Sequence, residues 1–489
     1  MAAEIGVSWS RILALLVLVA GLGTYLWVYE VPKAREEGKK AKLLGVDKDA
    51  ITGIDLVFPD REIELKKGDQ GWRIVKPVDA PADDPAVKGV VNTLADAEVQ
   101  RTLDEAPQDL AAFGLDKPNP LVKITVKSGA EPPPIAVGKN TAIGGKSYVR
   151  KGDEPKLYLT TSSLQYALNK QAKDLRDKQL VNFQDDDVQR VDITGDGKTT
   201  TLARKGKDAW VVEPGDLPAD LTEVRSYLST LRSTRASEFP DDAPADLGKY
   251  GLDQPKLTVT IATGKDGAET QSLLLGAEGT QGTQKLVYAK RASQPTVYGV
   301  GDWTTRSLGK QTNDFRDKTV LAFDQARVGR ITVERKDGGP GPTLARSGDT
   351  AWKVEGAGDG KKPKDTAISR FVDDLHDLRG ASIAAEPAAD LAPFGLNAPD
   401  LRITLTDKDG QAIGTTLGTK RDAKYYVMKA GGQTVYEARD YMYTRLDKRS
   451  GDFVEGETPA GATTTMPANP APPPAADEDA GEGEGEDEE

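Results

Sequence analysis

The six residues Phe113-Gly114-Leu115-Asp116-Lys117-Pro118 recur twice further along the chain. The second copy is Tyr250-Gly251-Leu252-Asp253-Gln254-Pro255, and the third is Phe394-Gly395-Leu396-Asn397-Ala398-Pro399. Glycine permits a tight turn, and proline favours an extended residue before it. We expect the aromatic and leucine side chains to fill a core. This motif is therefore interpreted as structural, and a ligand-contacting loop is the alternative.

Two further landmarks accompany the motif in the same order. A tryptophan precedes each copy, at Trp72, Trp210 and Trp352. An Asp-Lys pair follows each copy, with a Phe five residues after the Lys: Asp177, Lys178 and Phe183; Asp317, Lys318 and Phe323; Asp447, Lys448 and Phe453. Landmarks repeated at a nearly fixed period indicate tandem domains.

The segments between the landmarks have the same pattern in each copy. Apolar residues at helical spacing predict an amphipathic helix within 84–94, 220–231 and 365–378, with Asp84, Asp220 and Asp365 as expected N-caps. Strict alternation predicts half-buried strands at 122–126, 257–261 and 401–405. Strands ending at Gly138, Gly276 and Gly418, and then two tyrosine-bearing strands, follow. The predicted class is α+β: three tandem repeats, each a mainly antiparallel sheet packed on one main helix.

The ends of the chain differ from the repeats. Residues 12–28 are uncharged and apolar, with Tyr25, Trp27 and Tyr29 at one end, which predicts a transmembrane anchor over 12–29. A cleaved signal peptide is the alternative. The predicted organisation is a tail at 1–11, the anchor, a juxtamembrane linker at 30–45, repeats at 46–183, 184–323 and 324–454, and a disordered acidic tail at 455–489.

Composition excludes several classes of function. The net charge is -12, but ten acidic residues at 456–489 leave the rest of the chain at about -2, so no basic field for nucleic acid is present. The chain has no cysteine and one histidine, His376, which leaves little material for zinc sites or a Ser-His-Asp triad. We expect no cofactor, no metal and no nucleic-acid partner.

Three local motifs have plain structural readings. Gly195 to Thr199 resembles the end of a phosphate-binding loop, but Asp192 stands where that loop needs glycine, so a hairpin turn is expected. Asp185, Asp186 and Asp187 are read as a solvated linker or cap rather than a cation site. His376 is read as a boundary residue rather than a ligand.

Taken together, these features resemble a bacterial family known as domain of unknown function 4340. The resemblance rests on the anchor, the tryptophan element, the helix, the Phe-Gly-Leu-Asp-x-Pro motif, the strand ending in Gly, the tyrosine strand and Arg176-Asp177-Lys178, over about 46–453. The third copy differs, because Gly356 replaces the proline after the tryptophan element and Leu446 replaces the arginine of Arg176 and Arg316. The family has no established catalytic residues.

The resemblance implies a membrane-anchored envelope protein that accompanies ABC-type export permeases or gliding-like auxiliary subunits. Five basic residues follow the anchor, Lys33, Arg35, Lys39, Lys40 and Lys42, and by themselves they favour a cytoplasmic location for the repeats. The resemblance and Arg11 before the anchor favour the opposite. We expect a single-pass protein of the bacterial inner membrane with its repeats in the periplasm.

The expected function is non-catalytic: an accessory or scaffold subunit of an ABC-type transport or gliding-like surface-assembly system, with a permease or auxiliary subunit as partner. A binding module for a cell-envelope polymer is the alternative, and a carboxylate-based hydrolase is a remote one. The charged residues Arg176, Asp177, Lys178, Arg316, Asp317, Lys318, Asp447 and Lys448 are candidate inter-domain ion pairs. Solvent-screened pairs of little energetic value are the alternative.

Overall fold

The computed structural model describes residue 24 and residues 41–103, 109–348, 351–357 and 361–456. Contacts divide the chain into two compact units, residues 1–207 with 225–310, and 208–224 with 311–489. The predicted anchor, apart from Thr24, and the acidic tail beyond residue 456 lie outside the described residues. Within the described ranges, no helix combines the length and the apolar character that crossing a membrane requires.

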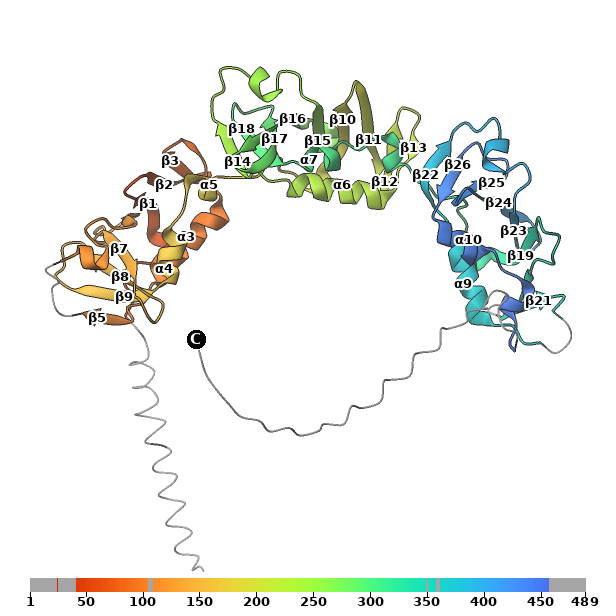
Figure 1. Ribbon diagram of the computed structural model, residues 1–489, viewed down its shortest axis with the longest axis horizontal. Helices are drawn as coiled ribbons and strands as arrows, with labels where there is room; N and C mark the ends of the chain where they lie inside the picture. The colour runs from red at the N-terminus through yellow and green to blue at the C-terminus, as the bar shows by residue number, and fades with distance from the viewer. Residues whose placement is uncertain (1–23, 25–40, 104–108, 349–350, 358–360, 457–489) are drawn as a thin grey trace, which may run out of the picture. The chain divides into compact units, whose positions relative to one another are not determined.

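The first repeat is built on a nine-stranded sheet in the order β4-β3-β2-β1-β6-β7-β8-β9-β5 (Figure 1). Its strands are β1 Ile51–Val57, β2 Glu62–Gly68, β3 Gly71–Lys76, β4 Ala80–Pro81, β5 Arg101–Leu103, β6 Leu121–Val126, β7 Ile135–Asn140, β8 Lys146–Lys151 and β9 Leu157–Thr161. Its helices are η2 Lys48–Ala50, α3 Asp84–Asp96, η3 Ala111–Phe113, α4 Ser163–Leu168 and α5 Ala172–Leu175.

The second repeat has the same order of elements, β13-β12-β11-β10-β15-β16-β17-β18-β14. Its strands are β10 Val188–Gly195, β11 Lys198–Gly206, β12 Ala209–Glu213, β13 Leu217–Pro218, β14 Glu238–Asp241, β15 Leu257–Thr263, β16 Glu269–Gln281, β17 Gln284–Arg291 and β18 Val297–Gly301. Its helices are η4 Asp185–Asp187, α6 Leu221–Ser233, η5 Gly248–Tyr250, η6 Lys265–Gly267, α7 Thr304–Leu308 and α8 Thr312–Phe315.

The third repeat has eight strands, in the order β21-β20-β19-β23-β24-β25-β26-β22. They are β19 Val328–Arg335, β20 Thr343–Ser347, β21 Ala351–Glu355, β22 Gly380–Ala385, β23 Leu401–Asp407, β24 Ala412–Arg421, β25 Lys424–Lys429 and β26 Val435–Ala438. The helices are η7 Gln325–Arg327, α9 Asp365–His376, η8 Ala392–Phe394, α10 Asp440–Leu446 and η9 Ser450–Phe453.

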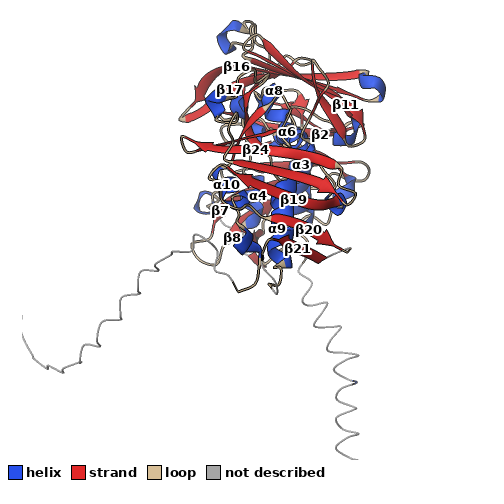
Figure 2. Ribbon diagram, turned by 90° about the vertical axis from the view of Figure 1, so that its right-hand side faces the viewer, coloured by secondary structure: helices blue, strands red, loops and turns tan. Residues whose placement is uncertain are grey.

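Each sheet consists of two antiparallel halves joined at its first strand. In the first repeat β1 pairs antiparallel with both β2 and β6, and β10 and β19 do the same in the later repeats. The main helix follows one edge of the sheet and leads to the short strand at the other edge, so it crosses one face. Figure 1 shows this for α6, and Figure 2 distinguishes the helices from the strands by colour. The predicted α+β repeats with mainly antiparallel sheets are confirmed.

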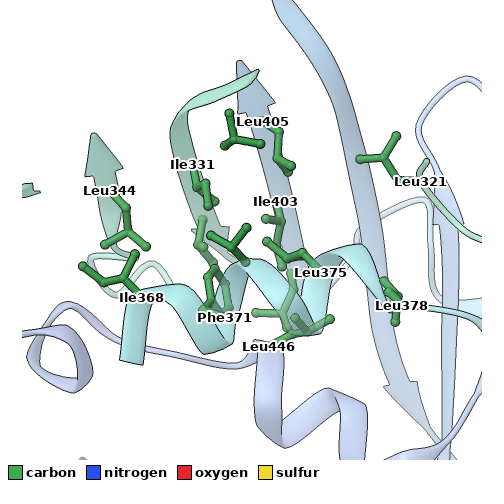
Figure 3. Close-up of a cluster of buried hydrophobic side chains, with 14 of the residues drawn as sticks. Leu321, Ile331, Leu344, Ile368, Phe371, Leu375, Leu378, Ile403, Leu405 and Leu446 are labelled. Atoms are coloured by element: carbon green, nitrogen blue, oxygen red, sulfur yellow. The ribbon is translucent and has the colours of Figure 1, made fainter. Parts of the chain in front are cut away.

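The main core of each repeat lies between this helix and the sheet. In the third repeat Ile368, Phe371 and Leu375 on α9 pack against Ile331 and Ile403 on the strands (Figure 3). In the first repeat Val87, Val90, Val91 and Leu94 on α3 occupy the same place. The helical spacing in the sequence predicted these faces. Trp72, Trp210 and Trp352 are each the second residue of their strand, β3, β12 and β21, and all are buried.

The aromatic-Gly-Leu motif forms a second, smaller cluster on the opposite face. Residues alternate between the faces of a strand. On β25, Tyr425 and Val427 join the main core, whereas Tyr426 and Met428 join a cluster with Phe394. In all three repeats the motif aromatic meets a tyrosine edge-on: Phe113 and Tyr148, Tyr250 and Tyr288, and Phe394 and Tyr426, at 4.9, 4.9 and 5.3 Å between ring centroids.

The repeated glycines allow the motif turn to lie directly on the sheet. Gly114, Gly251 and Gly395 have φ of 68°, 63° and 70°, a conformation that favours glycine. A Cβ at Gly138 would lie 2.3 Å from the carbonyl oxygen of Phe113, and one at Gly276 would lie 2.3 Å from that of Tyr250. In the third repeat, a Cβ at Gly418 would instead meet the hydroxyl of Tyr425. The structural reading of the motif explains the turn glycines of all three repeats and the strand glycines Gly138 and Gly276.

Two details of the sequence prediction need correction. Tyr250 is buried, but Phe113 and Phe394 are only partly buried, because their cluster on the outer face is small. The N-cap of α3 is Asp83, whose side chain accepts a hydrogen bond from the Ala86 amide, not Asp84. Asp84 instead accepts from the backbone amide of Trp72. Asp365 is in the first turn of α9 and follows an N-cap lysine, so of the three predicted caps only Asp220 caps its helix.

The contact at Gly276 predicts a matched pair of substitutions. Gly276→Ala should destabilise the protein by about 1–3 kcal/mol, because the methyl group would overlap backbone atoms of the motif. Gly89→Ala is the control: Gly89 is exposed in the middle of α3 and a Cβ there meets nothing within 4 Å, so a gain of up to about 1 kcal/mol is expected. Urea denaturation measures both; equal effects would contradict the packing described.

Candidate functional site

The chain passes from the first repeat to the second without a free linker. Before the crossing, Arg176 forms a β-bridge with Ala82, and the Asp83 amide donates to the Leu175 carbonyl. After it, Gln179 bridges Arg235, and the carbonyl of Lys178 accepts from the Ala236 amide. Backbone hydrogen bonds therefore hold the chain to the first repeat up to Asp177 and to the second from Lys178 onward.

The second junction repeats this arrangement. Arg316 bridges Ala219 before the crossing, and Thr319 bridges Arg379 after it. The carbonyl of Lys318 accepts from the Gly380 amide at 2.9 Å, and the Val320 amide donates to Leu378 at 3.1 Å. The two crossings thus occur at the same place in the repeat, at 177–178 and 317–318.

At the first junction a buried arginine reaches into the following repeat. The Arg176 guanidinium donates to both oxygens of Asp242, with Nη2 2.6 Å from Oδ1 and Nη1 3.2 Å from Oδ2. It also lies over the Phe239 ring, 3.9 Å from the centroid. Only 7% of Arg176 is exposed. A bidentate, stacked guanidinium of this kind fixes both the distance and the orientation of its partner.

The second junction has the equivalent pair. Arg316, 9% exposed, donates to both oxygens of Glu386, with Nη2 2.9 Å from Oε1. Thr434 donates to the same carboxylate at 2.7 Å. The hydrogen bonds from Arg316, and then that from Thr434, hold the pKa of Glu386 below its ordinary value of 4.5. We call Arg176–Asp242 and Arg316–Glu386 the junction ion pairs.

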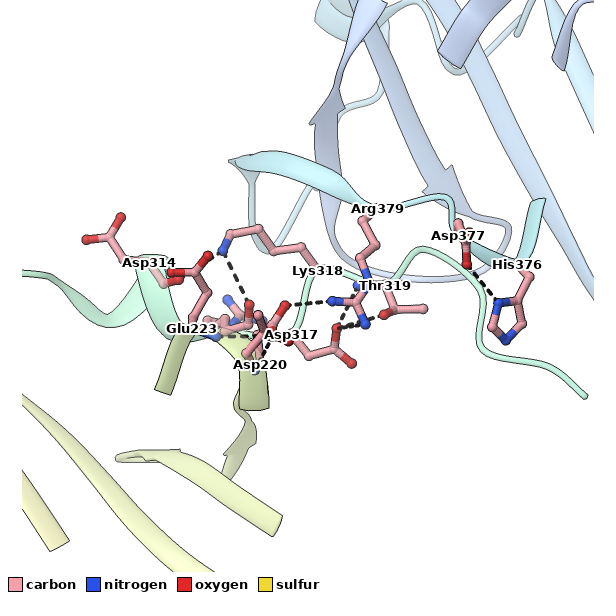
Figure 4. Close-up of polar contacts among 11 residues, drawn as sticks. Asp220, Glu223, Asp314, Asp317, Lys318, Thr319, His376, Asp377 and Arg379 are labelled. Carbon is pink, nitrogen blue, oxygen red and sulfur yellow. Dashed lines mark hydrogen bonds and ion pairs between the residues drawn. The ribbon is translucent and has the colours of Figure 1, made fainter. Parts of the chain in front are cut away.

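Further ion pairs run in the opposite direction across the junctions. Arg291 of the second repeat contacts Asp177 at 3.2 Å. Lys173 contacts Glu238 at 2.7 Å in the same direction as the Arg176 pair. At the second junction, Arg379 donates to Asp220 at 2.6 Å and lies 4.0 Å from Asp317 (Figure 4).

Arg176, Asp177, Arg316 and Asp317 therefore make contacts between successive repeats. The two lysines of these motifs act mainly through the backbone. The carbonyls of Lys178 and Lys318 anchor the following repeat, and the Lys318 ammonium donates to the carbonyls of Asp314 and Arg316.

The proposed equivalence of Asp447 and Lys448 with these residues is wrong. Asp447 is the C-cap of α10, the position of Asn169 after α4 and Gly309 after α7. It pairs with Arg335 inside the third repeat. The capping boxes Gln171–Asp174, Gln311–Asp314 and Arg449–Asp452 confirm this register.

The residue at the place of Arg176 and Arg316 is Val454, not Leu446, because Val454 bridges Pro363 as those arginines bridge Ala82 and Ala219. Val454 is buried in the core of the third repeat. The arginine therefore occurs at the two positions from which a further repeat follows.

A cavity of about 310 Å³ lies beside the first junction ion pair. Arg73, Arg176, Phe239, Arg291, Gln294 and Tyr298 contribute to its lining. Its cationic groups are already engaged: Arg73 pairs with Asp79, and Arg291 pairs with Asp177. The Tyr298 hydroxyl donates to Gln294 at 2.8 Å. This region is therefore a charge-balanced interface between two repeats.

The other motifs noted in the sequence form turns, a short helix and a surface contact. Asp196 and Gly197, with φ of 51° and 70°, form the turn between β10 and β11. Asp185 to Asp187 form η4, and Asp185 pairs with Arg232. His376 is exposed and contacts Asp377 at 3.0 Å. In the described ranges, no three His, Asp or Glu side chains lie together as a metal site would require.

Comparison with known proteins follows the repeat architecture. The profile of the family described as domain of unknown function (DUF4340) matches residues 72–211, 210–368 and 363–458. The chain belongs to this family, in three tandem copies. A search of curated proteins gives no significant match. The first matched segment runs from β3 to β12, and the second runs from β12 to α9, so each contains a junction in its interior.

A double-mutant cycle tests the first junction ion pair. Arg176→Ala, Asp242→Ala and the double variant should give a coupling free energy of about 1–3 kcal/mol, because the pair is bidentate and its arginine is buried. The control is Arg330–Glu355, which is also bidentate but exposed and within one repeat, with an expected coupling of about 0–1 kcal/mol. A coupling free energy no larger than that of the control would show that the Arg176–Asp242 pair contributes no more than an exposed ion pair.

The second junction should loosen in acid. Since the pKa of Glu386 is lowered by folding, the contribution of its charge is present above the ordinary value of 4.5 and is lost as the pH falls through the lower folded value. Hydrogen exchange at the Val320 and Gly380 amides reports this. At about pH 6, Glu386→Gln should exchange faster than wild type, and the difference should vanish in acid. A difference independent of pH would rule out this charge as the cause.

Proposed function

We propose that this chain is a non-catalytic, membrane-anchored envelope protein that acts as an accessory or scaffold subunit of an ABC-type transport or gliding-like surface-assembly system. The observation that carries the proposal is the pair of equivalent junctions. Each joins successive repeats by backbone hydrogen bonds on both sides of the crossing and by a buried arginine–carboxylate pair.

Such joints suit a subunit that presents several similar surfaces to a partner. When modules are linked, binding of a second module becomes intramolecular and its effective concentration rises, provided that the linkage permits simultaneous engagement. A connection without free residues reduces the conformational freedom that would otherwise be lost on binding. The apolar stretch at 12–28 supports an anchor in the bacterial inner membrane.

Placement of the repeats in the periplasm is part of this proposal. A reporter active only in the periplasm, fused after Phe453, should be active, and the matching cytoplasmic reporter should be silent. The reverse result would place the repeats inside the cell and remove the envelope-facing role.

The experiment for the scaffold function is purification of the tagged full chain from mildly solubilised membranes. A permease or auxiliary subunit should be recovered in stoichiometric amount. Arg176→Ala and Arg316→Ala should lower that recovery while the chain remains folded, whereas Arg330→Ala should not. Recovery of no membrane partner, with the chain intact, would contradict the proposal.

A polymer-binding function is the second candidate, and one observation favours it. Three of the four large hydrophobic residues that are strongly exposed in the described ranges lie at or beside the short helices α4, α7 and α10: Tyr166, Trp303 and Tyr441. Trp303 and Tyr441 are equivalent, since each stands six residues before the C-cap of its helix. Exposed aromatic rings at a repeated position suit a ligand with repeating units.

Retention on isolated wall polymer tests this candidate. Trp303→Ala with Tyr441→Ala should abolish retention if the function is polymer binding, and Ile143→Ala, which removes the fourth exposed side chain, is the control. Equal retention of both variants would exclude these rings as the binding surface.

A further inference from the structure

The apolar stretch and the basic run precede the first repeat, yet the chain enters this repeat as it enters the other two. The Ala41 carbonyl accepts from the Val99 amide at 2.8 Å, as Lys178 accepts from Ala236 at 2.8 Å and Lys318 from Gly380 at 2.9 Å. Lys42 bridges Glu98 as Gln179 bridges Arg235 and Thr319 bridges Arg379. The next residue is buried in each case: Leu43, Leu180 and Val320.

This register assigns a sequence position to the arginine of the junctions. Arg176 and Arg316 stand two residues before the lysines whose carbonyls anchor the next repeat. The residue two before Ala41 is Lys39. A cation therefore occupies the equivalent position ahead of all three repeats. It lies in the basic run from Lys33 to Lys42, at the end of the chain segment that precedes the described residues.

The first repeat also keeps a copy of the surface that receives the preceding repeat. In the second repeat, Tyr298 donates to Gln294 and lies beside Arg291, 5.6 Å from ring centroid to guanidinium. In the first, Tyr158 donates to Glu154 at 2.5 Å and lies under Lys151 at 4.6 Å. Thr102 is paired with Tyr158 as Ile383 is with Tyr436 in the third repeat. We call Thr102, Glu154 and Tyr158 the acceptor surface.

The acceptor surface differs from its counterpart in exposure and charge. Tyr298 is 4% exposed beside the first repeat, whereas Tyr158 is only partly buried. A carboxylate, Glu154, replaces the neutral Gln294. Asp96, in the last turn of α3, binds one residue of the basic run, with its Oδ1 2.5 Å from Lys42 Nζ. Within the acceptor surface, Lys151 Nζ lies 3.9 Å from Glu154 Oε1, so the charge of that carboxylate is balanced, and the carboxylate that contacts the basic run is Asp96.

We propose that residues 33–40, the juxtamembrane segment, cover the acceptor surface in place of a preceding repeat, with Lys39 in the position of Arg176 and Arg316. Three features support this occupant: the shared register at Ala41, the ion pair of Lys42 in the basic run with Asp96, and the use of the same surface as an interface in the later repeats. The segment then joins the anchor to the first repeat without a free linker. The proposal rests on the proposed function only in requiring that these residues remain on the mature chain.

This docking gives the basic run a structural role. Lysine and arginine beside a membrane segment ordinarily indicate the cytoplasmic side. Here the Lys42 ammonium pairs with Asp96, and its backbone bridges Glu98. In the proposed docking, Lys39 takes the place of a junction arginine. Two of the five basic residues after the anchor, Lys39 and Lys42, thereby have a structural role, and the number of charges carries less weight as evidence of orientation.

The chain contains no cysteine, so cross-linking with a short bismaleimide can be specific. In the full-length protein in nanodiscs, Lys39→Cys with Thr102→Cys should cross-link within one molecule. Arg176→Cys with Phe239→Cys, the equivalent pair at the first junction, sets the expected yield. Lys39→Cys with Lys67→Cys on β2, across the sheet, is the control and should link at least about five-fold less.

Two results would overturn the proposal. One is a Lys39–Thr102 yield no higher than that of the control while the Arg176–Phe239 pair links. The other is cross-linking of the single variant Thr102→Cys to another protein or to another copy of the chain. That result would show that a partner, and not residues 33–40, covers the acceptor surface.

A second measurement avoids cysteine at position 39. Lys39→Arg recreates the junction residue and should slow trypsin cleavage at Arg35 at least two-fold relative to wild type, whereas Lys39→Glu should accelerate it. Identical rates in the three proteins would refute docking through this residue.

The intact mass of the mature chain distinguishes the docking proposal from the proposed scaffold function. Loss of residues 30–40 from the mature chain would contradict only the docking proposal. Docking in a chain that recovers no membrane partner would contradict only the scaffold function.

Discussion

The close approach between the motif turn and the sheet is the constraint on which each repeat depends. The carbonyl of Phe113 or Tyr250 lies where a side chain on the adjacent strand would be, and only glycine at 138 or 276 leaves room for it. Because the turn lies on the face opposite the main helix, it covers apolar side chains that would otherwise meet water. The sheet can then carry apolar residues on both faces, as Tyr425 to Met428 do.

The junctions use a different combination of forces. Backbone hydrogen bonds hold the chain on both sides of each crossing, and they alone do not select the next repeat. The side chains of Arg176 and Arg316 add that selectivity, because a buried guanidinium must find a carboxylate with matched geometry. Phe239 provides a ring for stacking at the first junction, and Thr434 donates a further hydrogen bond to the carboxylate at the second. The pairs are equivalent in position while their surroundings differ.

Much of each repeat could be predicted from sequence because its signals are local and periodic. The helical spacing of Val87 to Leu94 and the alternation of Leu401 to Leu405 report directly which face is buried. The short strands β4, β5 and β13 were missed, since two or three residues carry no periodicity. The cap at Asp83 was misassigned by one residue because Asp84 is equally suitable by composition, and only the hydrogen bond to Trp72 distinguishes them.

The junction ion pairs show where sequence reasoning ends. Their arginines stand in a repeated motif, but Asp242 and Glu386 lie 66 and 70 residues away, and nothing local distinguishes them from other acids. The apparent third copy of the motif, Asp447-Lys448, matched by dipeptide and spacing although it belongs to a helix end. Its true counterpart is the apolar Val454, packed in the last core.

That replacement bears on what the repeats are for. If the arginine stabilised the repeat itself, the third copy would need it as much as the others, yet the third sheet and its core are complete with valine in that place. The arginine is present only where another repeat follows. The first two family matches also begin in one repeat and end in the next, so the matched unit includes the connection. The structure therefore directs attention away from a pocket within one repeat and toward the way repeats are joined and the surfaces that the joined repeats present.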